Sequence, residues 1–284
     1  MSAFPSLTIE GVTISRVICG TNALLGYSHV SAGRDAWARE YFTAQRIARV
    51  FARCQELGVN AVMGPLHSRL AEALDETARL TGQAMVWVAT TAADRAPAGQ
   101  LDALQAARAA GRVDEATAIS RASLADQAAE LKALGAAFCL LHGAWADRWP
   151  EERGGLVGCA DAMATIRAAG LVPGSSSHDA PRVSQLDDDA YGTAVLAAPV
   201  NRDGWFMRPS QADAMERYAR LRHPLIAIKT LACGKFEPEM DVAGSLRWAA
   251  AAPGVEAVAL GVMIEQEAEQ SLPILREAFA ERYG

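Results

Sequence analysis

The sequence predicts an α/β protein built as a (β/α)8 TIM barrel, and two observations lead to this prediction. Eight short and almost entirely apolar runs occur along the 284-residue chain, as parallel strands covered on both faces require. Stretches with helical periodicity separate these runs from end to end. The expected strands are residues 14–22, 59–65, 84–92, 136–144, 171–178, 194–201, 225–232 and 255–262. A doubly wound open sheet is the alternative, but the first strand is not followed by the G-x-G-x-x-G that favours it.

Capping residues and glycines mark the ends of the intervening helices. The Ser-x-x-Asp spacing predicts helices that begin at Ser123 and at Ser210. Three helices are expected to stop at a glycine: Gly58, Gly82 and Gly135. The last helix, from about Glu265, contains Pro273 and is expected to kink or restart there.

One TIM-barrel domain is expected to occupy residues 1–284, with two additions to the basic repeat. Residues 7–14 read as a short N-terminal hairpin that turns at Glu10-Gly11 and could plug the bottom of the barrel. Residues 93–119 form the longest insertion, and their alanine-rich part is expected to add helix beside the barrel mouth.

Composition restricts the partners that can be expected. The chain is 51% hydrophobic with a net charge of −6, and no Lys/Arg run stands out, which argues against nucleic acid and anionic membranes. Its start lacks the features of a secretory signal, and no run of about 18 apolar residues occurs. The five cysteines show no C-x-x-C spacing and read as free thiols. We expect a cytoplasmic protein with a small-molecule substrate, and a homo-oligomer is left open.

Four of the five histidines follow expected strands, at the barrel rim where chemistry gathers in this architecture. His142 ends the fourth strand, His178 ends the fifth, His67 follows the second, and His29 lies in the loop after the first. Lys229 lies within the apolar seventh strand. The same rim carries further candidates for catalysis or substrate binding, namely Asn22, Tyr27, Thr90, Trp145, Asn201, Asp203 and Trp205.

Each of these side chains also has a structural explanation. His142 could be a hydrogen-bonded core histidine, and His67 and His178 could cap helices. Lys229 could point outward and extend between helices, or inward as a base, a nucleophile or an anion-binding group. Tryptophans are more often packing residues than pocket walls.

Six segments resemble the aldo-keto reductase family and together cover most of the chain. They are TISRVICGTNALLGYSH, CQELGVNAVMG, FCLLHG, GSSSHDAPRVSQL, IAIKTLACGKF and PGVEAVALGVMIEQEAEQSL. The resemblance implies a (β/α)8 fold and NADPH-dependent reduction of carbonyl compounds, with a tyrosine acid surrounded by lysine, aspartate and histidine.

The departures from that family concern its catalytic and cofactor-binding groups. The second strand ends in V-M-G-P where the aspartate is expected, and the tyrosine is missing from GPLHSRL, where His67 is the nearest acid or base. Thr90 or Thr91 replaces the lysine, and His142 alone is retained. The Ser-Asn pair that holds the nicotinamide reads Ser-Ser at 176–177, and Glu265 lies where a basic residue would meet the 2′-phosphate. These departures disfavour NADPH as the cofactor.

The sequence therefore favours a non-redox enzyme with acid/base chemistry, a lyase, isomerase or hydrolase acting on a small polar, sugar-like carbonyl or hydroxyl metabolite. His142 would act with His178 or His67, and Lys229 would stabilise negative charge. The three histidines His67, His142 and His178 could instead bind a divalent metal ion. One alternative is an NADPH-dependent carbonyl reductase with Tyr27 or His67 as its acid, and another is a barrel that binds without catalysis.

Overall fold

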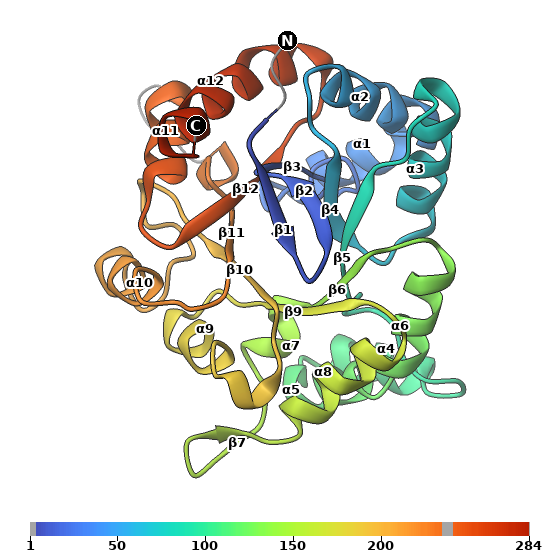
Figure 1. Cartoon of the computed structure of the whole chain (residues 1–284). Helices are drawn as coiled ribbons and strands as arrows, with labels where there is room; N and C mark the ends of the chain where they lie inside the picture. Colours follow the sequence, from blue (N-terminus) through green and yellow to red (C-terminus); the bar gives the residue numbers. More distant parts are fainter. Residues whose placement is uncertain (1–3, 235–240, 284) are drawn as a thin grey trace.

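The structure, a computed structural model, describes residues 4–234 and 241–283 and contains a closed barrel of eight parallel strands (Figure 1). Around the barrel the strands follow the order β10, β11, β12, β3, β4, β5, β6 and β9. Their bounds are β3 (Val17–Gly20), β4 (Ala61–Pro65), β5 (Val86–Thr90), β6 (Phe138–Leu141), β9 (Val172–Ser176), β10 (Val195–Pro199), β11 (Leu225–Ile228) and β12 (Val255–Gly261). Each strand lies within one of the eight predicted runs, so the predicted fold is confirmed.

The strands are shorter than the predicted runs because polar and glycine residues at the ends of the runs belong to loops. Helices follow the strands on the outside of the barrel (Figure 1). They are α2 (Ala44–Glu56), α3 (Ser68–Thr81), α6 (Leu124–Ala133), α8 (Cys159–Ala168), α9 (Ala180–Leu186), α10 (Gln211–Tyr218), α11 (Val242–Ala251) and α12 (Glu265–Tyr283). The last two residues of the segment IAIKTLACGKF, 235–236, lie outside the described residues.

Helix ends agree with the sequence at some positions and differ at others. Gly82 caps α3 with a left-handed φ of 73°, and the side chain of Ser210 accepts a hydrogen bond from the Asp213 N–H at 3.2 Å. The hydroxyl of Ser123 does not cap α6, because it donates to the Ser120 carbonyl at 2.7 Å. The helix does not restart at Pro273, since α12 continues through it from Glu265 to Tyr283.

The barrel interior follows from the alternation of side chains along each strand. Ile18, Val88, Phe138, Leu140 and Ile226 belong to one buried apolar cluster inside the ring. Side chains between them face the surrounding helices and form a second, larger cluster. This alternation fixes which residues of the uppermost layer face the mouth.

An N-terminal hairpin closes the bottom of the barrel, as predicted. It consists of β1 (Ser6–Ile9) and β2 (Val12–Ser15), and it turns at Glu10 and Gly11, whose φ angles are 47° and 83°. Ile9 and Ile14 are buried within the interior cluster of the barrel. Figure 1 shows this hairpin in blue, inside the ring of strands.

Four additional segments lie in the loops that follow the barrel strands. The predicted insertion contains α4 (Leu101–Ala109) and α5 (Val113–Arg121), which pack on each other around Leu104. The sequence did not predict α1 (Ala32–Tyr41), α7 (Gly143–Ala146) or the small hairpin of β7 (Glu151–Glu152) and β8 (Gly155–Leu156). Within the described part of the chain, no helix combines the length and apolar character needed to cross a membrane.

A substitution at Gly174 tests the interior packing. A β-carbon at this position of β9 would lie 2.7 Å from side-chain carbons of Leu140 and Val195, so Gly174→Ala overfills the interior. We expect the free energy of unfolding, measured by urea denaturation, to fall by about 1–3 kcal/mol. Gly261→Ala is the matched control, because an added carbon there has nothing within 4 Å and should change that free energy by less than about 0.5 kcal/mol. Equal losses in the two variants would contradict this packing.

Candidate functional site

His142 faces the barrel mouth from the end of β6. It follows the interior residues Phe138 and Leu140 at steps of two, so its side chain continues the inner face of the barrel. Its backbone N–H donates to Thr91 Oγ1 at 3.0 Å. Its ring Nδ1 accepts a hydrogen bond from the Ala144 N–H at 3.1 Å, which places the ring proton on Nε2.

Burial keeps His142 neutral. The low polarity of its surroundings lowers the pKa of His142 to about 4, and the charges of His178 and Lys229 act in the same direction. Near neutral pH the ring is therefore a hydrogen-bond donor through Nε2–H rather than a proton carrier. A neutral ring can end a buried strand because it carries no charge to desolvate.

His178 is held by Asp147, a residue that was not predicted from the sequence. The His178 Nδ1 lies 2.9 Å from Asp147 Oδ2, and the His178 backbone N–H donates to Asp147 Oδ1 at 2.9 Å. Arg208 and the Ser177 hydroxyl donate to the same carboxylate at 2.8 and 2.7 Å. Burial alone would raise the pKa of Asp147, but the hydrogen bonds from His178 and Ser177 outweigh it and hold that pKa below its usual value.

The ring of His178 packs directly on Gly143. A β-carbon at Gly143 would lie 2.8 Å from His178 Cε1, so this position must lack a side chain. The Asp147 contact occupies Nδ1, which leaves Nε2 as the ring atom for proton exchange. Asp147 follows α7 and gave no spacing signal, because its partner is 31 residues away in the chain.

Lys229 and His29 meet beside two aromatic rings. The Lys229 Nζ lies 3.0 Å from His29 Nε2, and it lies 5.5 and 5.2 Å from the ring centres of Trp205 and Phe206. Phe206 also packs edge-on against His178, with ring centres 5.3 Å apart. Burial lowers the pKa of Lys229. The structure thus brings together four residues predicted from the sequence, which are His29, His178, Trp205 and Lys229. Phe206 is a fifth, and it was not predicted.

The charge of Asp94 acts on both Tyr27 and His67. Burial raises the pKa of Tyr27, and the Asp94 charge adds to this effect. Burial also lowers the pKa of His67, with a smaller opposite contribution from Asp94. The Nδ1 of His67 caps α3 by accepting from the Arg69 N–H at 3.1 Å, so its predicted capping role is observed. Both side chains are neutral at pH 7.

Other predicted site residues have structural roles. Trp145 is fully buried and donates through Nε1 to the Ser120 hydroxyl at 3.2 Å, so it does not wall the mouth. The amide side chain of Asn201 is fully buried and binds both the N–H and the carbonyl of Trp205. Thr90 is buried on the inner face of β5, whereas Asn22 and Asp203 are exposed in loops.

The three histidines considered as metal ligands are not grouped as a metal centre. Over residues 4–234 and 241–283, no cluster of three or more His, Cys, Asp or Glu side chains is placed to hold a metal ion.

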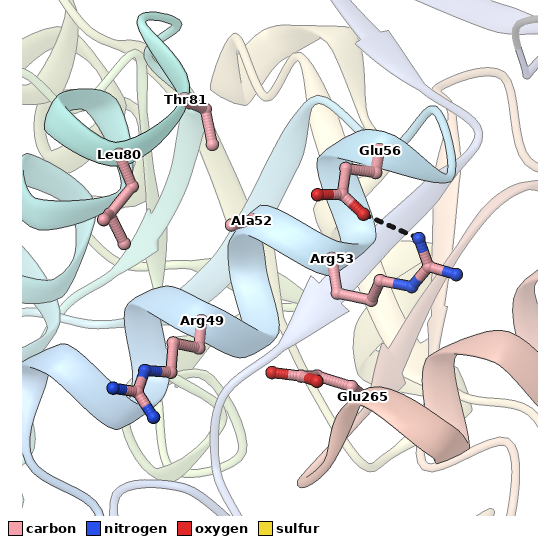
Figure 2. Close-up of a pocket in the computed structure, with 7 residues that line it drawn as sticks. All are labelled: Arg49, Ala52, Arg53, Glu56, Leu80, Thr81 and Glu265. Atoms are coloured by element: carbon pink, nitrogen blue, oxygen red, sulfur yellow. Dashed lines mark hydrogen bonds and ion pairs between the residues drawn. The ribbon is translucent and has the colours of Figure 1, made fainter.

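Glu265 lies on the outer surface, in a groove between α2, α3 and the start of α12 (Figure 2). The groove has a volume of about 540 Å³ and is lined by Arg49, Ala52, Arg53, Glu56, Leu80, Thr81 and Glu265. Figure 2 shows the Glu265 carboxylate directed toward α2, where Arg53 pairs with Glu56. This groove is separate from the mouth that holds His142.

Comparison with solved structures identifies the fold as that of aldo-keto reductases. A Pseudomonas aeruginosa protein assigned to these enzymes aligns with a TM-score of 0.61 and 17% identity over 96% of this chain and 94% of its own. An aldo/keto reductase from Brucella melitensis aligns at 0.58, with 12% identity over 99% and 98%. One from Klebsiella pneumoniae in complex with NADPH aligns at 0.56, with 15% identity over 97% and 90%. No family model and no curated protein matches the sequence.

These neighbours correct the function that the sequence favoured. They are all named as aldo-keto reductases, which contradicts the expected lyase, isomerase or hydrolase chemistry. The resemblance to the aldo-keto reductase fold is confirmed, and the reductase alternative is the one these neighbours favour.

The buried state of His142 predicts a specific loss of stability in acid. Its pKa is about 4 in the folded protein, against 6.5 for an unperturbed histidine, so the unfolded chain binds the proton more tightly. Stability from this group is present above about pH 6.5 and is lost as the pH falls toward about 4. Between about pH 7.5 and about pH 5 we expect a loss of about 2 kcal/mol in the free energy of unfolding.

His142→Asn removes this titration while leaving every other ionisable group in place. Urea unfolding of both proteins at the two pH values gives the difference directly. The variant should lose about 2 kcal/mol less than the wild type over this range. Parallel pH profiles for the two proteins would show that His142 is not held neutral by the fold.

Proposed function

We propose that the protein is an NADPH-dependent carbonyl reductase of the aldo-keto reductase type, with a rewritten active site. The observation that carries this proposal is the neutral His142, whose Nε2–H faces the mouth beside the Asp147–His178 pair. The likeness to reductases, one of them in complex with NADPH, supports it. A small-molecule substrate and a cytoplasmic location are part of the proposal.

His142 would bind and polarise the substrate carbonyl. A neutral imidazole donates Nε2–H to the carbonyl oxygen, and this hydrogen bond strengthens as negative charge develops on that oxygen. Because Ala144 and Thr91 hold the ring and its backbone, the donor is fixed before the substrate arrives. Such preorganisation avoids the cost of reorienting a dipole during the reaction.

His178 would supply the proton. Asp147 fixes the ring through Nδ1, so Nε2 can donate to the oxygen as it becomes an alkoxide. The carbonyl carbon gains a hydride, the oxygen gains this proton, and the product is an alcohol. We assign the acid role to His178 rather than to Tyr27 or His67, because burial raises the pKa of Tyr27 and makes it a weaker acid, and burial lowers the pKa of His67 and disfavours its protonated form.

The charges around β10 and β12 fit the phosphates of NADPH, which when bound supplies the hydride. Arg34 on α1 lies against the residue that follows β12, with its Nη2 3.4 Å from Met263 Sδ. Arg202 follows β10 and pairs with Asp241 at the start of α11. Guanidinium groups bind phosphate oxygens well. The first turn of α12 is acidic and would repel a phosphate, and Glu267 already accepts the Met263 N–H at 2.7 Å. In this proposal Arg34 and Arg202, rather than the start of α12, would hold the phosphates.

Titration with NADPH, followed through cofactor fluorescence and tryptophan quenching, tests the proposal first. Micromolar binding, followed by consumption of NADPH with an aldehyde, is the expected outcome. NADH titrated in parallel shows whether the acidic start of α12 changes the cofactor preference. Failure of either cofactor to bind at millimolar concentration would overturn the proposal.

His142→Phe should remove the hydrogen bond to the developing alkoxide while keeping an aromatic ring in place. We expect kcat/KM for an aldehyde to fall by about 100-fold or more, measured from NADPH consumption. His223→Asn is the control, because His223 lies before β11 at the opposite end of the barrel and should keep wild-type activity. An unchanged kcat/KM in His142→Phe would remove His142 from the mechanism.

Substitutions of the Asp147–His178 pair test the proton donor. His178→Gln should lower kcat by about 100-fold, because the variant lacks the ring nitrogen proposed to give the proton. Asp147→Asn should lower kcat less, by about 10-fold, because the ring loses the carboxylate that orients it. A wild-type kcat in His178→Gln would transfer the acid role to Tyr27 or His67.

A further inference from the structure

We propose that the carbonyl substrate is a short-chain oxo acid, and that Lys229 binds its carboxylate beside Phe206. This inference rests on the proposed reductase function and adds the substrate class. It follows from the backbone conformation, charge and ring contacts of four residues from three different loops: His29, Trp205, Phe206 and Lys229.

Strained backbone is concentrated at this site. His29, Phe206 and Lys229 are non-glycine residues with left-handed φ angles of 58°, 60° and 57°. Such conformations are unfavourable for bulky side chains and persist where the surroundings hold them. Three of them meet in one cluster although they come from the loops after β3, β10 and β11. The strain directs their side chains toward a shared point at the mouth.

Among the described residues, no carboxylate pairs with the positive charge of Lys229. No carboxylate of residues 4–234 or 241–283 lies within ion-pair distance of Lys229. An ammonium group has three N–H donors, and one of them is directed at His29 Nε2, 3.0 Å away. The remaining donors can bind the two oxygens of a carboxylate. Because Lys229 is half-buried, an anion there would restore favourable interactions that burial has removed.

The neighbouring anion cannot serve this purpose. Asp147 is the carboxylate beside His178, and it is already engaged by His178, Ser177 and Arg208. The charge of Lys229 nevertheless reaches the reaction centre, since it contributes to the low pKa of His142. A bound carboxylate would therefore sit in the same mouth as the carbonyl that His142 polarises.

Phe206 connects the carbonyl end to the carboxylate end. Its ring centre lies 5.3 Å from that of His178 and 5.2 Å from Lys229 Nζ, so one ring borders both the proton donor and the cation. An apolar surface between two polar groups fits a short methylene chain. The ligand that matches the two histidines, the Phe206 ring and the Lys229 charge is a small molecule with a carbonyl, a few methylene groups and a carboxylate.

The test compares succinic semialdehyde with its methyl ester, which has the same carbonyl but no charge. We expect kcat/KM for the acid to exceed that for the ester by about 10- to 100-fold in the wild type. In Lys229→Met this ratio should fall close to one, and Lys229→Arg should retain most of it. Lys132→Met is the matched control, because Lys132 binds the Gly170 carbonyl at the opposite end of the barrel and should leave the ratio unchanged.

Calorimetric titration with succinate separates this inference from the reductase proposal, because it needs no turnover. Wild-type protein should bind succinate, and Lys229→Met should weaken that binding at least 10-fold while its melting temperature confirms a folded protein. Lys229-dependent succinate binding in a protein that reduces no carbonyl would support the carboxylate site and reject the reductase. Equal reduction of acid and ester, or succinate binding that survives Lys229→Met, would overturn the inference.

Discussion

Closure of the barrel is the constraint on which the rest of the structure depends. Once eight parallel strands close, alternate side chains must fill the interior, and only the uppermost layer can be polar without being buried in an apolar core. Phe138 and Leu140 fill the lower layers of β6, and His142 is the next residue on that face. Thr90 stands in the same relation to Val88 on β5. The chemistry of the mouth is therefore set by strand register before any loop is considered.

Two histidines at this mouth show how environment divides one residue type into two roles. His142 is surrounded by protein and neighbouring positive charges, so its neutral form is favoured and its pKa is about 4. His178 is held at Nδ1 by the buried carboxylate of Asp147, 2.9 Å away, which leaves Nε2 as its available ring nitrogen. In the proposed mechanism His142 is therefore the fixed hydrogen-bond donor and His178 the group that gives the proton.

Local patterns predicted much of the fold because strand and helix periods depend on nearby residues. The eight apolar runs, the glycine that ends α3 and the inward direction of His142 follow from spacing alone. Asp147 and Phe206 could not be found in this way, since each acts through a partner on another strand or loop. Trp145 was expected at the mouth for a related reason. His142, three residues earlier, faces the mouth, but the Trp145 ring is fully buried and its Nε1 donates to the Ser120 hydroxyl. Burial and long-range pairing decide roles that residue type leaves open.

The positive charge at the mouth comes from the end of one strand. Thr90, the last residue of β5, carries no charge and contributes only a hydroxyl to the inner face. The positive charge enters instead from β11, where Lys229 turns inward through a left-handed backbone. Low-polarity surroundings make the field of a single ammonium group significant at His142. The apolar interior of this barrel and the charges at its mouth are therefore supplied by different residues, the first by the strands and the second by residues at the strand ends.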